Sequence, residues 1–320
     1  PNITANQSNI PMLVKATAEA EPAAALAGLL AETTAENQDV VGNLDQRTML
    51  VRGQNNRDMW GHNSQKLALA VTKKLPFSIE LEQPQVPLVR DGSTDYVVRA
   101  KRDEGYNERI YLRVLYNPSG CRASGSIRIE PDKSEARIPV TANAKAAIGS
   151  FPITVLARAK SRDAAVWVAS DFIHLEVADS FFELKFGKTV AETGSSGVIA
   201  VGINAKRPPE GSVELELVGL PAGVTSPQPK AVWEEGTEQV AFPIQVAEDA
   251  RVGQFKTIYV KATITRPEGK IVQTAGRGEL QLAAPVPATT QVAVAEKQPE
   301  AASAKPLSRL EQLRLSLIHI

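Results

Sequence analysis

A long internal repeat is the feature that most constrains how this chain can fold. The stretch over residues 135–159 reads EARIPVTANAKAAIGSFPITVLARA, and it returns downstream as EQVAFPIQVAEDARVGQFKTIYVKATI. Pro139 recurs as Pro243 and Gly149 as Gly253, each 104 residues later (243 minus 139 and 253 minus 149). A repeat of this length, longer than the periods of solenoid proteins, predicts tandem domains.

The repeated stretch has the pattern of β-structure. Apolar residues from Phe151 to Ala157 occupy every second position, as expected of a strand with one buried face. Similar runs are predicted as strands at residues 77–82, 86–89, 94–102, 110–116, 126–130 and 166–177. Turn residues separate these runs about every eight to twelve residues, which is typical of a sandwich. The sequence therefore predicts an all-β protein made of tandem immunoglobulin-like β-sandwiches.

The repeat and the composition also divide the chain. Residues 1–76 are predicted to be a partial sandwich, truncated at its start, because the repeated stretch recurs there only in part, around Pro11. Residues 77–178 and 179–284 are predicted to be complete sandwiches, joined by a linker too short to allow wide changes of angle. Residues 285–320 are rich in Ala and Pro and are predicted to form a disordered tail. We interpret residues 315–320 as a sequencing adaptor read in frame; the alternative is the end of a short amphipathic helix.

Composition excludes several classes of function. Of the 320 residues, 43% are hydrophobic and 22% are charged, and the formal net charge is zero, so nothing points to a nucleic-acid partner. No apolar run is long enough to span a bilayer. The chain begins at Pro1 rather than Met, so the lack of a signal peptide is uninformative.

The sequence offers little catalytic chemistry. The three histidines, His62, His174 and His319, are far apart in the sequence, and they suggest neither a nucleophile–histidine–acid set nor a metal site. His174 is predicted to be an exposed strand residue. The single cysteine, Cys121, is predicted to be a small hydrophobic residue near the rim of a sandwich rather than a reactive thiol. We expect no enzyme activity, no metal and no cofactor.

One stretch is a candidate ligand-binding loop. Residues 54–63 combine amide side chains with an acid, an imidazole and one large aromatic ring, a mixture able to hold a sugar or a peptide; the candidate residues are Gln54, Asn55, Asn56, Asp58, Trp60 and His62. In the alternative interpretation, the segment is a long ordered turn whose side chains cap backbone groups, with Trp60 covering the edge of a core.

Several short segments carry a resemblance to a known family. They are Gly53-Gln54-Asn55-Asn56, Ala70-Val71-Thr72 with Pro76-Phe77, Val86-Pro87-Leu88-Val89-Arg90-Asp91-Gly92-Ser93, Ile138-Pro139-Val140-Thr141-Ala142-Asn143, Val166-Trp167-Val168 and Gly278-Glu279-Leu280. With them the chain resembles the tandem immunoglobulin-like region of large exported proteins of planctomycete-type bacteria, which often also carry pre-peptidase C-terminal domains. With a single cysteine, the antibody-type Cys…Trp…Cys pattern is absent, so the likeness to true immunoglobulins is architectural.

The resemblance implies a bacterial protein located outside the cell, on its surface or in the periplasm. Its implied role is that of a non-catalytic spacer, scaffold or adhesion module. Its partners would be other domains of the same longer chain and a cell-surface protein or polysaccharide. Two alternatives remain: the accessory region of a secreted peptidase or carbohydrate-active enzyme, and a carbohydrate-binding module that uses residues 54–63.

Overall fold

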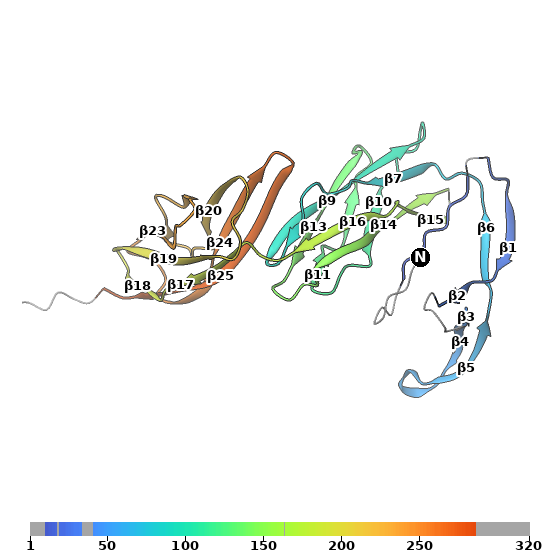
Figure 1. The fold of residues 1–320 in the computed structure, drawn as a ribbon, viewed down its shortest axis with the longest axis horizontal. Helices are drawn as coiled ribbons and strands as arrows, with labels where there is room; N and C mark the ends of the chain where they lie inside the picture. Colours follow the sequence, from blue (N-terminus) through green and yellow to red (C-terminus); the bar gives the residue numbers. More distant parts are fainter. Residues whose placement is uncertain (1–9, 18, 34–40, 163, 286–320) are drawn as a thin grey trace, which may run out of the picture.

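The computed structural model describes residues 10–17, 19–33, 41–162 and 164–285, and nearly every element in it is a β-strand. Within these ranges there is no α-helix, and none of the elements could cross a membrane as a helix. Two sandwiches follow one another along the long axis of the molecule, with a group of hairpins at the N-terminal side (Figure 1). The predicted all-β class is confirmed.

The first complete sandwich, here called the middle sandwich, contains ten strands. They are β7 (Phe77–Leu81), β8 (Leu88–Val89), β9 (Gly92–Arg102), β10 (Ile110–Leu115), β11 (Cys121–Ala123), β12 (Ile127–Ile129), β13 (Glu135–Ala142), β14 (Gly149–Ser161), β15 (Ala164–Ala169) and β16 (Ile173–Ala178). One sheet has the order β11-β13-β9-β7, and the other has the order β12-β10-β14-β16-β8, with β15 also paired to β14. All pairs are antiparallel except β8 with β16.

The second complete sandwich, here called the C-terminal sandwich, repeats this topology. Its strands are β17 (Phe182–Phe186), β18 (Thr189–Glu192), β19 (Ser196–Ala205), β20 (Ser212–Val218), β21 (Val224–Thr225), β22 (Lys230–Trp233), β23 (Gln239–Val246), β24 (Gly253–Arg266) and β25 (Gly269–Ala283). One sheet has the order β17-β19-β23-β21, and β22-β20-β24-β25 with β18 forms the other. In both sandwiches the central strands pair as strands A, B and E and strands C, F and G of an immunoglobulin-like sandwich do.

Individual registers confirm the repeat predicted from the sequence. Gly149 begins β14 opposite Val177, and Gly253 begins β24 opposite Leu282. Both glycines have a positive φ, 144° and 153°. The alignment of the two repeats slips near Phe151 and Phe255, where Ile153 matches Ile258 better, and this slip predicts a bulge. Register shifts flank Ile258 in the β24–β25 ladder. The repeated prolines, Pro139 and Pro243, lie in β13 and β23, the same strand of each sandwich.

One connection differs from the sequence prediction. In the sequence, the run Gly194-Ser195-Ser196-Gly197 between two apolar stretches predicts a hairpin turn, but the strands on its two sides belong to different sheets. β18 pairs in parallel with β25, whereas β19 pairs with β17 and β23. The turn therefore crosses the sandwich. A local turn signal identifies the reversal of the chain but not the partner of each strand.

Each sandwich has its own apolar core. The core forms because apolar and polar residues alternate along the strands. In β7, for example, Phe77, Ile79 and Leu81 are buried, whereas Ser78 and Glu80 are exposed. Tyr96 and Leu175 are among the largest fully buried side chains of the middle sandwich, and Phe182 and Phe242 fill the same role in the C-terminal sandwich.

The two sandwiches share a sheet. Val272 and Gln273 of β25 pair with Ser93 and Gly92 of β9, so one sheet of each sandwich joins into a single sheet of nine strands. Val89, which precedes β9, is fully buried within the core of the C-terminal sandwich. The short linker predicted from the sequence is thus reinforced by a continuous backbone ladder.

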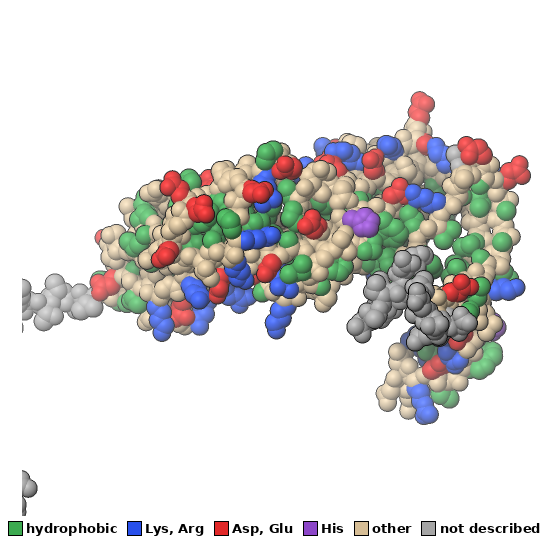
Figure 2. Space-filling view, in the orientation of Figure 1, with side chains coloured by type: hydrophobic (Ala, Val, Ile, Leu, Met, Phe, Trp, Pro, Cys, Tyr) green, Lys and Arg blue, Asp and Glu red, His purple; other side chains and the backbone are tan. Residues whose placement is uncertain are grey.

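Residues 10–76 lack such a core, since no described residue there is buried. They form three two-stranded sheets, in which β1 pairs with β6, β2 with β3 and β4 with β5. The strands are β1 (Ala23–Ala27), β2 (Leu30–Glu32), β3 (Val41–Asn43), β4 (Gln46–Arg52), β5 (Asp58–Ser64) and β6 (Leu67–Val71). Apolar side chains lie at the surface of these hairpins (Figure 2). The partial sandwich assigned to residues 1–76 stays a prediction, and the predicted tail at residues 286–320 lies outside the described residues.

Candidate functional site

The candidate segment at residues 54–63 is not the loop that the sequence predicts. Residues 54–56 form a single 3-10 turn, η1 (Gln54–Asn56), and the chain continues directly into β5. β4 and β5 pair with each other, so the segment is the tip and one strand of a hairpin. Runs of Asn, Asp and Gly favour turns, and here they mark only the tip, because the backbone groups of β5 bond to those of β4.

The amide residues of the tip have a conformational role. Asn55 and Asn56 both have positive φ, 56° and 60°, which Asn tolerates better than most residues. The backbone N–H of Gly53 donates to the carbonyl oxygen of Arg57 at 2.9 Å and closes the turn. The side-chain oxygen of Asn56 accepts a hydrogen bond from Arg52. The turn therefore gives Asn55 and Asn56 a structural role.

A bulge divides the remaining candidate residues between two faces of the hairpin. The register moves by one residue at Met59, between the pairs Val51–Trp60 and Arg52–Asp58. Asp58 accepts a hydrogen bond from Arg47 Nε at 2.8 Å, and the side chain of Arg47 runs close to Gly61. Because residues alternate along a strand, Trp60 and His62 point to the face opposite Gly61. The structure therefore places Trp60 with His62 and separates Asp58 from them.

Trp60 does not cover the edge of a core. Its side chain is 63% exposed, and no described residue of these hairpins is buried. The part of the alternative interpretation in which Trp60 covers the edge of a core is therefore wrong. The neighbouring residues Leu50 and Met59 are also exposed, at 54% and 61%. The face that carries Trp60 and His62 is thus an open surface.

The other residues considered from sequence have structural roles. Cys121 is half-buried in β11 and packs against the core of the middle sandwich, and burial raises the pKa of its thiol. A thiol held protonated is a poor nucleophile. His174 is exposed on β16, as predicted. Among the described residues there is no group of three or more His, Cys, Asp or Glu side chains placed to hold a metal ion.

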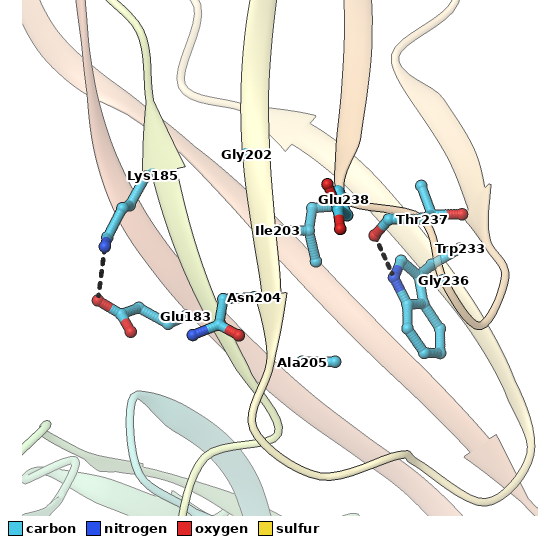
Figure 3. A pocket seen from close by; sticks show the side chains of 10 residues that line it. All are labelled: Glu183, Lys185, Gly202, Ile203, Asn204, Ala205, Trp233, Gly236, Thr237 and Glu238. Carbon is cyan, nitrogen blue, oxygen red and sulfur yellow. Dashed lines mark hydrogen bonds and ion pairs between the residues drawn. The ribbon is translucent and has the colours of Figure 1, made fainter.

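One hollow of the C-terminal sandwich is an open groove of about 500 Å³ beside β17 and β19 (Figure 3). Two pairs of polar groups line it: Lys185 Nζ lies 3.6 Å from Glu183 Oε1, and the Trp233 indole N–H donates to the carbonyl oxygen of Thr237 at 3.1 Å. Figure 3 shows these two pairs on opposite sides of the groove. Asn204 and Glu238 also line the groove, and its lining residues include no histidine or cysteine.

A second hollow, of about 630 Å³, lies where the sandwiches meet, and its lining includes Gln83, His174, Glu176, Asp179 and Arg207. Gln83 is tied in place, because its side chain donates to the carbonyl oxygen of His174 at 2.7 Å and accepts from the His174 N–H at 2.9 Å. Sequence analysis missed this junction, because it depends on contacts between strands far apart in the sequence.

The strand order defines the chain as a tandem immunoglobulin-like protein. No family model and no curated protein matches it. Among solved structures, a protein of unknown function from Porphyromonas gingivalis W83 aligns with 10% identity and a TM-score of 0.25, covering 65% of this chain and 100% of that one. A chimeric titin Z1Z2 tandem aligns with 14% identity and a TM-score of 0.21, covering 65% and 100%. The D0-D1 domain of intimin aligns with 11% identity and a TM-score of 0.22, covering 64% and 97%. These values support neither a shared family nor a shared activity.

Proposed function

We propose that this chain is a non-catalytic, rigid spacer or scaffold region of an exported or cell-surface multidomain protein. The observation that carries the proposal is the sheet continuous from β9 to β25, together with Val89 buried in the core of the next sandwich. Two domains joined by a flexible linker do not share a backbone ladder, whereas a spacer gains from one because it fixes the angle between its domains.

Further hydrogen bonds at the junction support the same role. The carbonyl oxygen of Asp91 accepts a hydrogen bond from the N–H of Thr274 at 2.6 Å, which extends the β9–β25 pairing. Gln273 is fully buried and accepts from the backbone N–H groups of Phe181 and Phe182 at 2.9 and 3.1 Å. Its own amide donates to the carbonyl oxygen of Phe182. Strand β25 is therefore fixed both to β9 and to the start of its own sandwich.

An exported location and a relation to proteins with pre-peptidase C-terminal domains are part of the proposal. They rest on the sequence motifs of the middle sandwich and the hairpins, and the partners they suggest are other domains of the same longer chain. Carbohydrate binding through Trp60 and His62 is a second candidate function. It is favoured by the exposure of Trp60 on one face of the β4–β5 hairpin.

The spacer role predicts a fixed distance between the sandwiches. The chain has one cysteine, so Cys121→Ala gives a background for two spin labels, at Arg137→Cys in β13 and Lys230→Cys in β22. Pulsed electron paramagnetic resonance should give one narrow distance distribution. The control pair, Lys185→Cys with Lys230→Cys, lies within the C-terminal sandwich and defines the width expected of a rigid body. A distribution much broader than the control would contradict the spacer role.

A further inference from the structure

A row of arginine and aromatic side chains crosses the solvent face of the middle sandwich. Tyr111 of β10 lies opposite Arg158 of β14, which lies opposite Trp167 of β15. The Arg158 guanidinium carbon is 5.2 Å from the centre of the Tyr111 ring and 5.7 Å from that of Trp167. On the other side of Tyr111, β12 contributes Arg128. These four residues are here called the arginine–aromatic row.

The row is accessible to a partner. Tyr111 is 40% exposed and Trp167 is 51% exposed, although aromatic side chains of this size are usually well covered. The two rings lie two strand spacings apart, about 10 Å. The strands that carry them, β10 and β15, lie on either side of β14 in the sheet. A row that runs across three paired strands suits an extended molecule better than a small one enclosed in a pocket.

The same face is cationic. Its basic side chains outnumber its carboxylates. Among the described residues of β10, β12, β14 and β15 and the residues directly next to these strands, Glu130 is the one carboxylate beside Arg109, Arg113, Arg128, Arg158 and Lys160. Glu130 is already shared by Arg109 and Arg128, at 2.8 and 2.5 Å. Within the described part of the chain, no carboxylate pairs with Arg113, Arg158 or Lys160. A surface of unneutralised cations attracts an anionic partner.

The repeat supplies an internal comparison. In the C-terminal sandwich the equivalent row is Val232, Glu214, Thr263 and Val272, paired strand by strand in the same order. It contains neither an arginine nor an aromatic residue, and Glu214 pairs with Lys230 at 2.9 Å. The C-terminal sandwich therefore has the same topology without an arginine–aromatic row, so the topology does not require the row.

We propose that the arginine–aromatic row is a binding face for an acidic polysaccharide, with uronate sugars as its ligand class. The exposed rings of Tyr111 and Trp167 offer flat surfaces to the apolar faces of successive sugars. The guanidinium group of Arg158, which no carboxylate of the described residues neutralises, matches a uronate carboxylate in geometry as well as in charge. This binding face is independent of the spacer role, because it lies within one sandwich and does not involve the β9–β25 junction.

The test uses the full chain and oligogalacturonate as the probe, with binding measured by isothermal titration calorimetry. Neutral cello-oligosaccharide and a single-stranded thymidine oligonucleotide are the comparison ligands. Arg158→Ala and Trp167→Ala should each weaken oligogalacturonate binding at least tenfold, as expected of anchors at the centre of an interface. The matched control, Thr263→Ala, changes the equivalent of Arg158 in the other sandwich and should bind like the wild type. Binding should also weaken as salt is added.

Cross-strand stacking could instead serve stability alone. In that case Arg158→Ala and Trp167→Ala would lower the melting temperature and leave binding unchanged, which would overturn the proposal. Absence of oligogalacturonate binding, or equally tight binding of the oligonucleotide, would also overturn it. Should Trp167→Ala fail to fold, Arg158→Glu, which inverts the central charge and keeps a long side chain, provides the decisive measurement: wild-type affinity in this variant would refute the proposal.

Discussion

Asp91 and Asp179 lie at the same junction between the sandwiches, but their pKa values move in opposite directions. Burial raises the pKa of Asp91, and the charges of Lys206 and Arg90 only partly oppose it. The pKa of Asp179 is lowered because the backbone N–H of Ser180 donates to its carboxylate, with further help from Lys206 and Arg90. The same two cations thus act on both acids, and the difference comes from burial and from one backbone hydrogen bond.

The Asp179 shift predicts a pH dependence. A carboxyl group whose folded pKa is lowered stabilises the fold above its unfolded pKa of about 3.9, and that contribution is lost as the pH falls through the folded value. Asp179→Asn keeps an oxygen for the Ser180 N–H but removes the charge. The mutant should therefore be less stable than the wild type at pH 7. The difference should shrink as the pH falls below about 4 and vanish only below the lowered folded pKa of Asp179. Urea denaturation across this pH range checks it; a difference that stays constant would mean that the charge is not involved.

At the scale of single elements, the β4–β5 hairpin shows how a bulge changes a site. Alternation along residues 58–62 would place Asp58, Trp60 and His62 together, but the shift at Met59 turns Asp58 toward Arg47. Bulges of this kind redirect a side chain without ending the pairing of the strands. In β24, a similar irregularity next to Ile258 leaves the ladder intact on both sides.

The exposure of Trp60 predicts that its removal has little effect on stability. Trp60→Ala should change the free energy of unfolding by no more than about 0.5 kcal/mol, because the side chain fills no core. If the hairpin binds saccharides, the same change should weaken that binding by about 1–3 kcal/mol, and Trp60→Phe, which keeps an aromatic ring, should weaken it less. Thermal melts beside a glycan array measure both effects. A loss of several kcal/mol of stability would show that Trp60 packs against a partner surface.

At the scale of the whole molecule, the two sandwiches are joined by more than a covalent linker. Gly92 lies where the backbones of both sandwiches come closest. A Cβ atom there would lie 2.6 Å from the carbonyl oxygen of Val272 and 2.7 Å from that of Val89. Both contacts are with backbone atoms, which cannot move aside without breaking the β9–β25 pairing. Glycine at this position is therefore a requirement of the junction.

Gly92→Ala should open the junction. We expect a loss of about 1–3 kcal/mol, the range for overpacking a buried site, and a broader distance distribution between labels in β13 and β22. Gly125→Ala is the matched control, because no atom lies within 4 Å of a Cβ built there. Pulsed electron paramagnetic resonance and thermal melts on both variants check this. Unchanged distances in Gly92→Ala would mean that the shared ladder does not hold the sandwiches in place.

The sequence by itself determined the parts of this protein that depend on local patterns. Alternating apolar residues identified most of the strands, because the two faces of a strand differ in burial. The repeat determined that two sandwiches have one topology, down to the matching positions of Gly149 and Gly253. It also located the irregularity near Phe255, because a change of offset within a repeat has to be absorbed by a bulge or a loop.

Only the tertiary structure decided which strand edges meet. The pairing of Gly92 with Gln273 joins residues far apart in the sequence, and no local pattern records it. The same is true of Tyr111, Arg158 and Trp167, which form a row only because the registers of three strands align. Local alternation depends on a period of two along one strand, whereas register depends on packing between strands, so the sequence indicates the strands and the fold sets their neighbours.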